Sequence, residues 1–451
     1  MRGHLLAIYT SVVLQIISLP VFCQDTTYNA DKFYPVSQVK ADLHFLKAQL
    51  DSIHPGLYHY TTRDSLQAFF DNLNNSIVRP MHEQEFLGLI MLLNAKICDG
   101  HTMFLPSEAA MLYNSTRGRF LPFTVAIIKG KLYITENCST DTSIQPGTEI
   151  TRINGQDISA VINQLLLRQI RDGHNQTYPL WILNHYFAAY YSYAFGQPAS
   201  YSLHLITNKK EIIRQVPALT KDSIRLTRQK RYGDLQSPVG SKGAISLEEQ
   251  KATNTAILTI KSFDAEWVQA VHKQDFSSVV DSIFTQIRKH RTKNLLLDLR
   301  DNQGGDFETG RHLLSYLVTS SSLYLTGGNE SRILQPKENN FTGKLFVLIN
   351  GGSFSNTAIV SACLERDRRA TFIGEETGGN KSMAYGEAAY VVLPHTRIQA
   401  YISTTAFPIT RLRNDHGIIP QYNVQPSLAD LLTGKDTAKT FALKLIKDEE
   451  K

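Results

Sequence analysis

Apolar positions divide the chain into stretches with different periodicities. From about residue 38 to residue 97 they recur every three or four residues, as on one face of a helix. This spacing predicts three helices, over Val39–Ile53, Leu66–Ile77 and Glu85–Ile97. The third is apolar nearly all round, which predicts burial. We assign residues 30–112 to an N-terminal helical domain.

The next stretch reads as short strands separated by turns. Strands are predicted over Phe120–Ile128, Lys131–Thr135 and Thr148–Ile153, with turns at Pro146-Gly147 and Asn154-Gly155. The segment from Gln145 to Ile158, with its Pro-Gly turn, strand and Ile-Asn-Gly turn, resembles a PDZ domain. That resemblance implies a module at residues 113–219 that binds extended peptide ends by strand addition. The alternative is an ordinary small β-rich insert. The aromatic run from Trp181 to Phe195 fits neither pattern.

Strands and helices alternate in the last part of the chain. Residues 220–250 are polar and basic and are predicted as a linker, and residues 251–435 as an α/β core. Strands over Ala256–Ile260, Leu295–Leu299, Leu345–Ile349 and Thr371–Gly374 are separated by helical patterns, which predicts a largely parallel sheet covered on both faces. Extended structure follows from Ala388, and residues 436–451 are predicted as a C-terminal helix or tail.

The N-terminus and the composition limit the class of protein and its location in the cell. Arg2 and an apolar run before Cys23 predict a signal peptide at residues 1–23, hence a periplasmic or secreted protein. A lipoprotein anchored through Cys23 is the alternative, which Phe22 disfavours. No later stretch is apolar enough to span a bilayer. A net charge of +6 over 451 residues gives no support for a nucleic-acid partner. The three cysteines that follow Cys23 exclude a full disulfide framework.

The serines after the strand Leu345–Ile349 have the setting of a nucleophile. Gly351 and Gly352 allow a sharp turn, and a helix follows the Ser-Phe-Ser-Asn cluster. Such a turn lifts a hydroxyl off the sheet and aims helical amides at a developing oxyanion. The alternative is that Ser353 or Ser355 only caps the helix.

Three further segments could supply chemistry to the same place. His101 follows Asp99-Gly100 just past the third helix, and two glycine-rich loops follow the strands that end at Leu299 and Ile373. Parallel strands place such loops at one edge of a sheet, where open α/β folds hold their sites. We therefore expect the loops around Gly304-Gly305, Ser355 and Gly378-Gly379 to meet.

These motifs together resemble the C-terminal processing (tail-specific) serine proteases, whose catalytic domain is shared with tricorn protease. The matching pieces, in order, are Asp298–Gly305, Gly352–Asn356, Gly374–Gly379 and Gly417–Pro420. With the helical and PDZ-like parts, the resemblance covers nearly all of the mature chain. It implies a multi-domain α+β fold with a crotonase/ClpP-like α/β serine protease core.

The resemblance assigns roles to named positions. The family's nucleophile, the second serine of a Ser-x-Ser cluster, falls on Ser355, and its oxyanion hole falls on Gly304 or Gly305 with Asn356. The bacterial branch takes a lysine 25 positions after the serine as its base; here that position is Asn380, and Lys381 is one residue late. The tricorn-like branch uses an upstream histidine, which matches His101.

The remaining catalytic positions depart from the tricorn-like pattern. Its downstream acid falls nearest to Asp415, although the family's Glu position lies closer to Asn414. Its serine before the histidine is Gly100 here. Histidine is also the better base on physical grounds, because a lysine must be desolvated to lose its charge. Asp415 could instead be a turn residue and Lys381 a solvated loop lysine. No metal site or cofactor is indicated.

The sequence thus predicts an exported serine endopeptidase that cleaves unfolded polypeptide tails or peptides, with Ser355, His101 and Asp415 as the catalytic residues. Lys381 is kept as the alternative base. One rival is a catalytically inactive peptide-binding protein on the same scaffold. A second is a crotonase-like hydratase, which would need coenzyme A and leaves Ser355 without a role.

Overall fold

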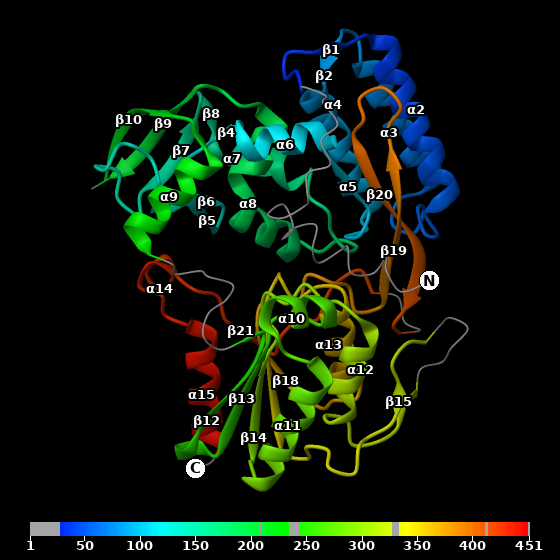
Figure 1. Ribbon diagram of the computed structural model, residues 1–451, viewed down its shortest axis with the longest axis vertical. Helices are drawn as coiled ribbons and strands as arrows, with labels where there is room; N and C mark the ends of the chain where they lie inside the picture. The colour runs from blue at the N-terminus through cyan, green and yellow to red at the C-terminus, as the bar shows by residue number, and fades with distance from the viewer. Residues whose placement is uncertain (1–27, 208, 234–242, 327–332, 411–413, 450–451) are drawn as a thin grey trace.

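The computed structural model describes residues 28–449 except residues 208, 234–242, 327–332 and 411–413. The signal peptide predicted at residues 1–23, with Cys23, lies outside the described residues. The described chain forms a helical part and a β-rich module side by side above an α/β core (Figure 1).

The core is a six-stranded sheet in the order β12-β13-β14-β17-β18-β21, in which only β12 is antiparallel to its neighbour. The four central strands are the ones predicted from apolar runs. Both faces of these strands are buried, which explains why their sequences are continuously apolar. The strands span β12 Ile245–Gln250, β13 Thr255–Ile260, β14 Asn294–Asp298, β17 Lys344–Ile349, β18 Thr371–Gly374 and β21 Tyr422–Asn423.

Helices cover the two faces of this sheet with different side chains of the same strands. Leu295, Leu297 and Val347 pack on one face with α11, α12 and α13, whereas Leu296 and Phe346 pack on the other with α15. This alternation follows from the two-residue period of a strand. The helices span α11 Phe276–Lys289, α12 Phe307–Ser315, α13 Asn356–Arg366 and α15 Thr437–Glu449.

The N-terminal part is helical, with α2 Val36–Ile53, α3 Arg63–Ser76, α4 Glu83–Ile90 and α5 Asn94–Ile97. The third predicted helix is therefore interrupted: a 3₁₀ turn, Met91–Leu93, separates α4 from α5. A hairpin from the core, β19 Met383–Val392 and β20 Gln399–Pro408, buries Ala400 and Ile402 against these helices. Strand β3, Met103–Leu105, pairs with β20 and so fastens the segment after His101 to the core.

The β-rich module holds a sheet in the order β10-β9-β7-β6-β5, backed by α7 Ile158–Leu166 and α8 Thr177–Phe195. The aromatic run that matched no predicted element is α8, whose backbone leaves helical geometry at Tyr186. The strands span β5 Phe123–Ile128, β6 Lys131–Asn137, β7 Glu149–Ile153, β9 Ser200–Thr207 and β10 Lys210–Pro217.

The segment predicted as a linker differs from that prediction. It contains α9, Lys221–Tyr232, which begins at a Thr220 cap, and strand β12. Helix α9 has no buried residue, so its polar sequence carries no apolar stripe to reveal it. Strand β12 forms because it pairs with β13 over six residues. The sequence of β12 alone does not indicate that pairing.

Candidate active site

The hydroxyl of Ser355 stands at the turn between β17 and α13, where the parallel strands end. Its backbone has φ 53° and ψ −125°, a strained conformation for a residue with a side chain. Its side chain does not cap the helix. Instead Nε2 of His101 lies 3.0 Å from its Oγ. The neighbouring Ser353 is fully buried and donates to the carbonyl of Leu299 at 2.9 Å, a structural role.

The ring of His101 is held next to the serine by a stack of aromatic rings. Its ring stacks on Phe354 with centroids 4.7 Å apart, and Phe354 stacks on Tyr178 of α8 at 4.1 Å. The helical part therefore supplies the imidazole, the core supplies the hydroxyl and Phe354, and Tyr178 of the β-rich module packs on Phe354. A ring nitrogen at this distance can take the serine proton directly.

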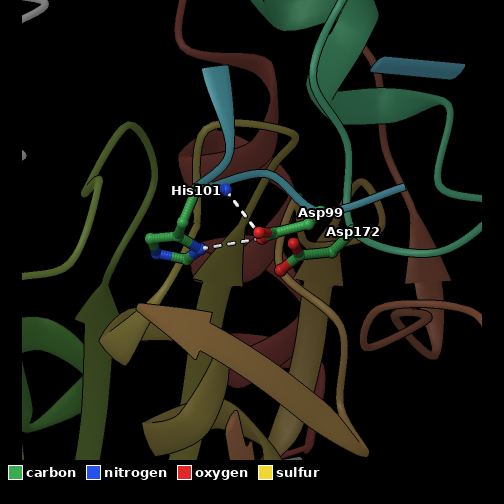
Figure 2. A group of neighbouring side chains, drawn as sticks. All are labelled: Asp99, His101 and Asp172. Carbon is green, nitrogen blue, oxygen red and sulfur yellow. Dashed lines mark hydrogen bonds and ion pairs between the residues drawn. The ribbon is translucent and has the colours of Figure 1, made fainter. Parts of the chain in front are cut away.

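Two buried carboxylates, Asp99 and Asp172, lie together on one side of the His101 ring (Figure 2). Nδ1 of His101 lies 3.7 Å from Oδ1 of Asp99, beyond hydrogen-bond length but within ion-pair reach. The same Oδ1 accepts the His101 amide at 2.8 Å. Asp172, from the loop after α7, accepts the amides of Gly100 at 2.8 Å and Asn380 at 3.3 Å. It thereby joins all three parts of the chain.

Burial and charge move the pKa values of this group in different directions. Burial opposes ionisation of Asp99, but its contacts with His101 and His54 prevail and hold its pKa well below the usual range. Burial, with the charge of Asp99 beside it, raises the pKa of Asp172 to about 6. Burial disfavours the imidazolium of His101, yet Asp99 and Asp172 outweigh it and raise the His101 pKa.

The three side chains could also be considered as metal ligands, because their ligand atoms lie within 4.8 Å of one another. However, each carboxylate oxygen already accepts at least one hydrogen bond, from residues that include Thr102 and Ser403. Nε2 of His101 faces the serine. At a separation of 3.0 Å a proton can pass between these two side chains.

The predicted oxyanion loop lies beside the serine. An added Cβ on Gly304, whose φ is +95°, would lie 2.7 Å from Cβ of Ser355 and 2.8 Å from the amide nitrogen of Asn356. The amide of Gly304 itself donates to Oδ1 of Asn302 at 2.9 Å. Asn356 is the first residue of α13, so its amide has no acceptor within the helix. Gly305, with φ +134°, forms a bridge with Phe263.

Two of the predicted residues lie elsewhere. Nζ of Lys381 pairs with both carboxylate oxygens of Glu365, at 3.2 and 3.1 Å. The amine that would have to accept the serine proton is thus engaged in an ion pair. The carboxylate of Asp415 lies 3.5 Å from Nδ1 of His174 and is one-third exposed. Asp99, two residues before the histidine, occupies the place beside His101 that we predicted for Asp415 from the sequence.

The tricorn-like pattern has a serine at the position of Gly100, and steric crowding explains why this chain has a glycine there. A Cβ there would lie 2.5 Å from the Phe354 ring and 2.9 Å from Oδ1 of Asp172. The space for a serine side chain is thus filled by the ring that supports His101 and by a carboxylate. Asp172 carried no signal in the sequence, since it lies in a loop 71 positions after His101 with no recognisable motif.

Comparisons with known proteins show what this chain is similar to. Residues 254–424 match the family model of peptidase family S41. The chain is 28% identical over 170 residues to a carboxy-terminal-processing protease of Bartonella bacilliformis, covering 36% of this chain and 38% of that protein. It is 26% identical over 139 residues to a tail-specific protease of Haemophilus influenzae, covering 30% and 19%. The matches thus span well under half of these relatives' length.

Among solved structures, the crystal structure of mature CPAF is similar over 91% of this chain and 97% of that one, with a TM-score of 0.64 and 14% sequence identity. Such a likeness supports the fold, and the prediction of a mixed α/β chain is confirmed. The family match and the relatives support the class of serine-type peptidases. Among the residues that the structure describes, no helix combines the length and apolar character needed to cross a bilayer.

Proposed function

We propose that this protein is an exported serine endopeptidase that cleaves unfolded protein tails or peptides. The observation that carries the proposal is the 3.0 Å contact between Nε2 of His101 and Oγ of Ser355. It joins residues 254 positions apart, at the edge of the sheet where the glycine loops converge. Acyl transfer by a serine requires a base within hydrogen-bond reach of the hydroxyl. Packing of the two parts of the chain would not by itself require this polar contact.

The reaction would begin when Ser355 attacks a peptide carbonyl and His101 takes its proton. Asp99 lies beside Nδ1 and stabilises the imidazolium that forms. The oxyanion would be stabilised by the amide of Asn356 and by the double-glycine loop. Because the amide of Gly304 is already donated to Asn302, we assign that second contact to Gly305. His101 then returns the proton to the leaving amine.

The other parts of the chain would bind substrate. We propose that the β-rich module is PDZ-like and holds an extended peptide end at its sheet, and that the tricorn-like Ser/His pairing replaces the Ser/Lys pairing of the bacterial branch. The signal peptide predicted at residues 1–23 would direct the protein to the periplasm or the exterior.

Covalent labelling with a fluorophosphonate tests the mechanism, since the reagent reports an activated serine. Wild-type protein should label, and Ser355→Ala should not. His101→Ala should lower the labelling rate by about 10³-fold or more, because the hydroxyl loses its base. Lys381→Ala is the matched control and should label at close to the wild-type rate. A folded wild-type protein that labels no faster than Ser355→Ala would favour the inactive peptide-binding protein.

A further inference from the structure

A second imidazole lies on the other side of Asp99 from His101. His54 follows α2 directly, and its Nε2 lies 3.1 Å from Oδ2 of Asp99. Both side chains of this pair are fully inaccessible to solvent. No step of the proposed reaction uses His54, and a buried histidine beside a catalytic carboxylate needs an explanation.

The contacts of His54 fix its tautomer. The amide of Gly56 donates to Nδ1 at 3.0 Å, so Nδ1 presents a lone pair and the ring hydrogen is on Nε2. Nε2 therefore donates to Asp99. Gly56 is itself confined, because an added Cβ would overlap the ring of Tyr385 on β19. The backbone thus holds His54 with Nε2 as the donor to Asp99.

Donors from separate elements converge on Asp99. Oδ2 accepts hydroxyl hydrogens from Thr102 at 2.7 Å and from Ser403 of β20 at 2.6 Å, in addition to Nε2 of His54. Oδ1 accepts the His101 amide and faces Nδ1 of the same residue. The donors on Oδ2 therefore set both the orientation of the carboxylate and the negative charge that it presents to His101.

We propose that His54 is a positioning residue, whose Nε2–H aims the Asp99 carboxylate at His101 and tunes the basicity of that imidazole. The inference rests on the proposed function, since it concerns the same proton transfer. The competing explanation is structural: His54 could serve only to accept the Gly56 amide after the end of α2.

Several ionisable groups surround this relay. Asp172 faces His101 from the loop after α7, and Tyr385 faces His54 from β19, with ring centroids 5.2 Å apart. Burial raises the pKa values of the neighbouring Tyr60 and Cys98, so both stay uncharged. The charged groups near Cys98 are Arg171, Lys96, Asp172 and Asp415. Asp99 lies between the two imidazoles and contacts both of them, so substitutions at residue 54 act on His101 first through Asp99.

Three substitutions separate the two explanations. His54→Gln retains an amide donor near the position of Nε2, whereas His54→Leu retains none. His54→Asn retains an acceptor near Nδ1 for Gly56 but cannot reach Asp99. A positioning role predicts that Gln resembles the wild type and that Asn and Leu fail together. A purely structural role predicts that Asn is the variant that resembles the wild type.

The pH dependence of kcat/KM for peptide hydrolysis gives the first measurement. Activity falls on the acidic side as His101 is protonated. Without the His54 donor, Asp99 presents more negative charge and the imidazolium is favoured, so the acidic limb should move to higher pH by about 0.5 to 1 unit in His54→Asn and His54→Leu. An unchanged limb in His54→Asn, whatever the loss of rate, would overturn the inference.

Nitrogen-15 NMR of histidine-labelled full-length protein gives a second measurement that needs no turnover. The His101 resonance, assigned with His101→Ala, should titrate at higher pH in His54→Asn than in the wild type or His54→Gln. If wild-type protein neither labels nor hydrolyses peptide, the proposed function fails, and the titration still tests the relay. Identical His101 midpoints in His54→Asn and wild type would refute His54 as a positioning residue.

Discussion

At the scale of single residues, the site depends on which of two neighbouring carboxylates keeps its charge. Both side chains are buried, but they differ in their hydrogen-bond donors. Asp99 accepts from two hydroxyls, an imidazole and a backbone amide and remains ionised, whereas Asp172 accepts from two backbone amides only. The two acids are separated in pKa by their surroundings, as catalytic pairs commonly are.

Asp172→Asn tests this difference through stability. The folded-state pKa of Asp172, raised to about 6, exceeds the ordinary value of 3.8, so the folded protein binds an extra proton between those pH values. This stabilisation is complete below about pH 4 and is lost as the pH rises through about 6. The unfolding free energy of the wild type should therefore fall across that window by about 2–3 kcal/mol more than that of Asp172→Asn. Urea denaturation at a series of pH values measures it.

The exposed Asp157 provides the control, because its replacement by asparagine should leave the wild-type slope intact. The side-chain amide introduced by Asp172→Asn would also oppose one backbone amide donor, which lowers stability at every pH, so only the slope is diagnostic. Equal slopes for wild type and Asp172→Asn between about pH 4 and pH 6 would show that this carboxyl titrates normally.

At the residue scale, the resemblance to the C-terminal processing proteases predicted the pair that meets, His101 and Ser355. It assigned the acid to Asp415, because the family pattern places a carboxylate before the last glycine motif. Asp99 was inside a motif already noted, and the tight turn through Gly100 brings its carboxylate back to the His101 ring. Only the fold shows that turn, and no spacing connects Asp172 to either residue.

At the scale of elements, the loop after β14 brings the backbone of Gly304 into close contact with Ser355 in the loop after β17. Gly304→Ala tests that closeness. The new methyl group would meet Ser355 and the amide of Asn356, in a backbone region that favours glycine. We expect the second-order labelling rate to fall by about 10²-fold or more, since the oxyanion donors would be displaced.

Gly130→Ala is the matched control for backbone strain. Gly130 has φ +76° and nothing within 4 Å of an added Cβ, so the variant should lose about 1 kcal/mol of stability and keep its labelling rate. Full labelling of folded Gly304→Ala would place the oxyanion donors elsewhere.

The elements that the sequence predicted share a property: most of their residues are buried, so their own sequences are visibly apolar. The four central strands and the helix after Ser355 are of this kind. Helix α9 and strand β12 are not, since α9 buries nothing and β12 depends on β13. Helix α8 is apolar and aromatic on most of its surface because it has two apolar partners. It packs on the β-rich module on one side and on Phe354, next to His101, on the other.

At the scale of the whole molecule, the residues of the candidate site are divided between parts that meet only in the folded chain. His101, Asp99 and Asp172 precede residue 233, and Ser355 and the glycine loop follow residue 243. Strand β3 pairing with β20, and the hairpin packed on the helical part, hold the halves together. We therefore expect His101 to reach Ser355 only when both halves associate.

Dividing the chain between residues 233 and 243 tests this dependence. A fragment of residues 28–233 and a fragment of residues 243–449 should each fail to react with a fluorophosphonate above the Ser355→Ala background. Co-expressed, they should associate through the buried hairpin residues and regain labelling of Ser355, measured by gel fluorescence after size-exclusion chromatography. A His101→Ala version of the first fragment should associate equally and restore nothing. Labelling of the second fragment alone at the full rate would place the general base within the core, with Lys381 released from Glu365 as the group to examine.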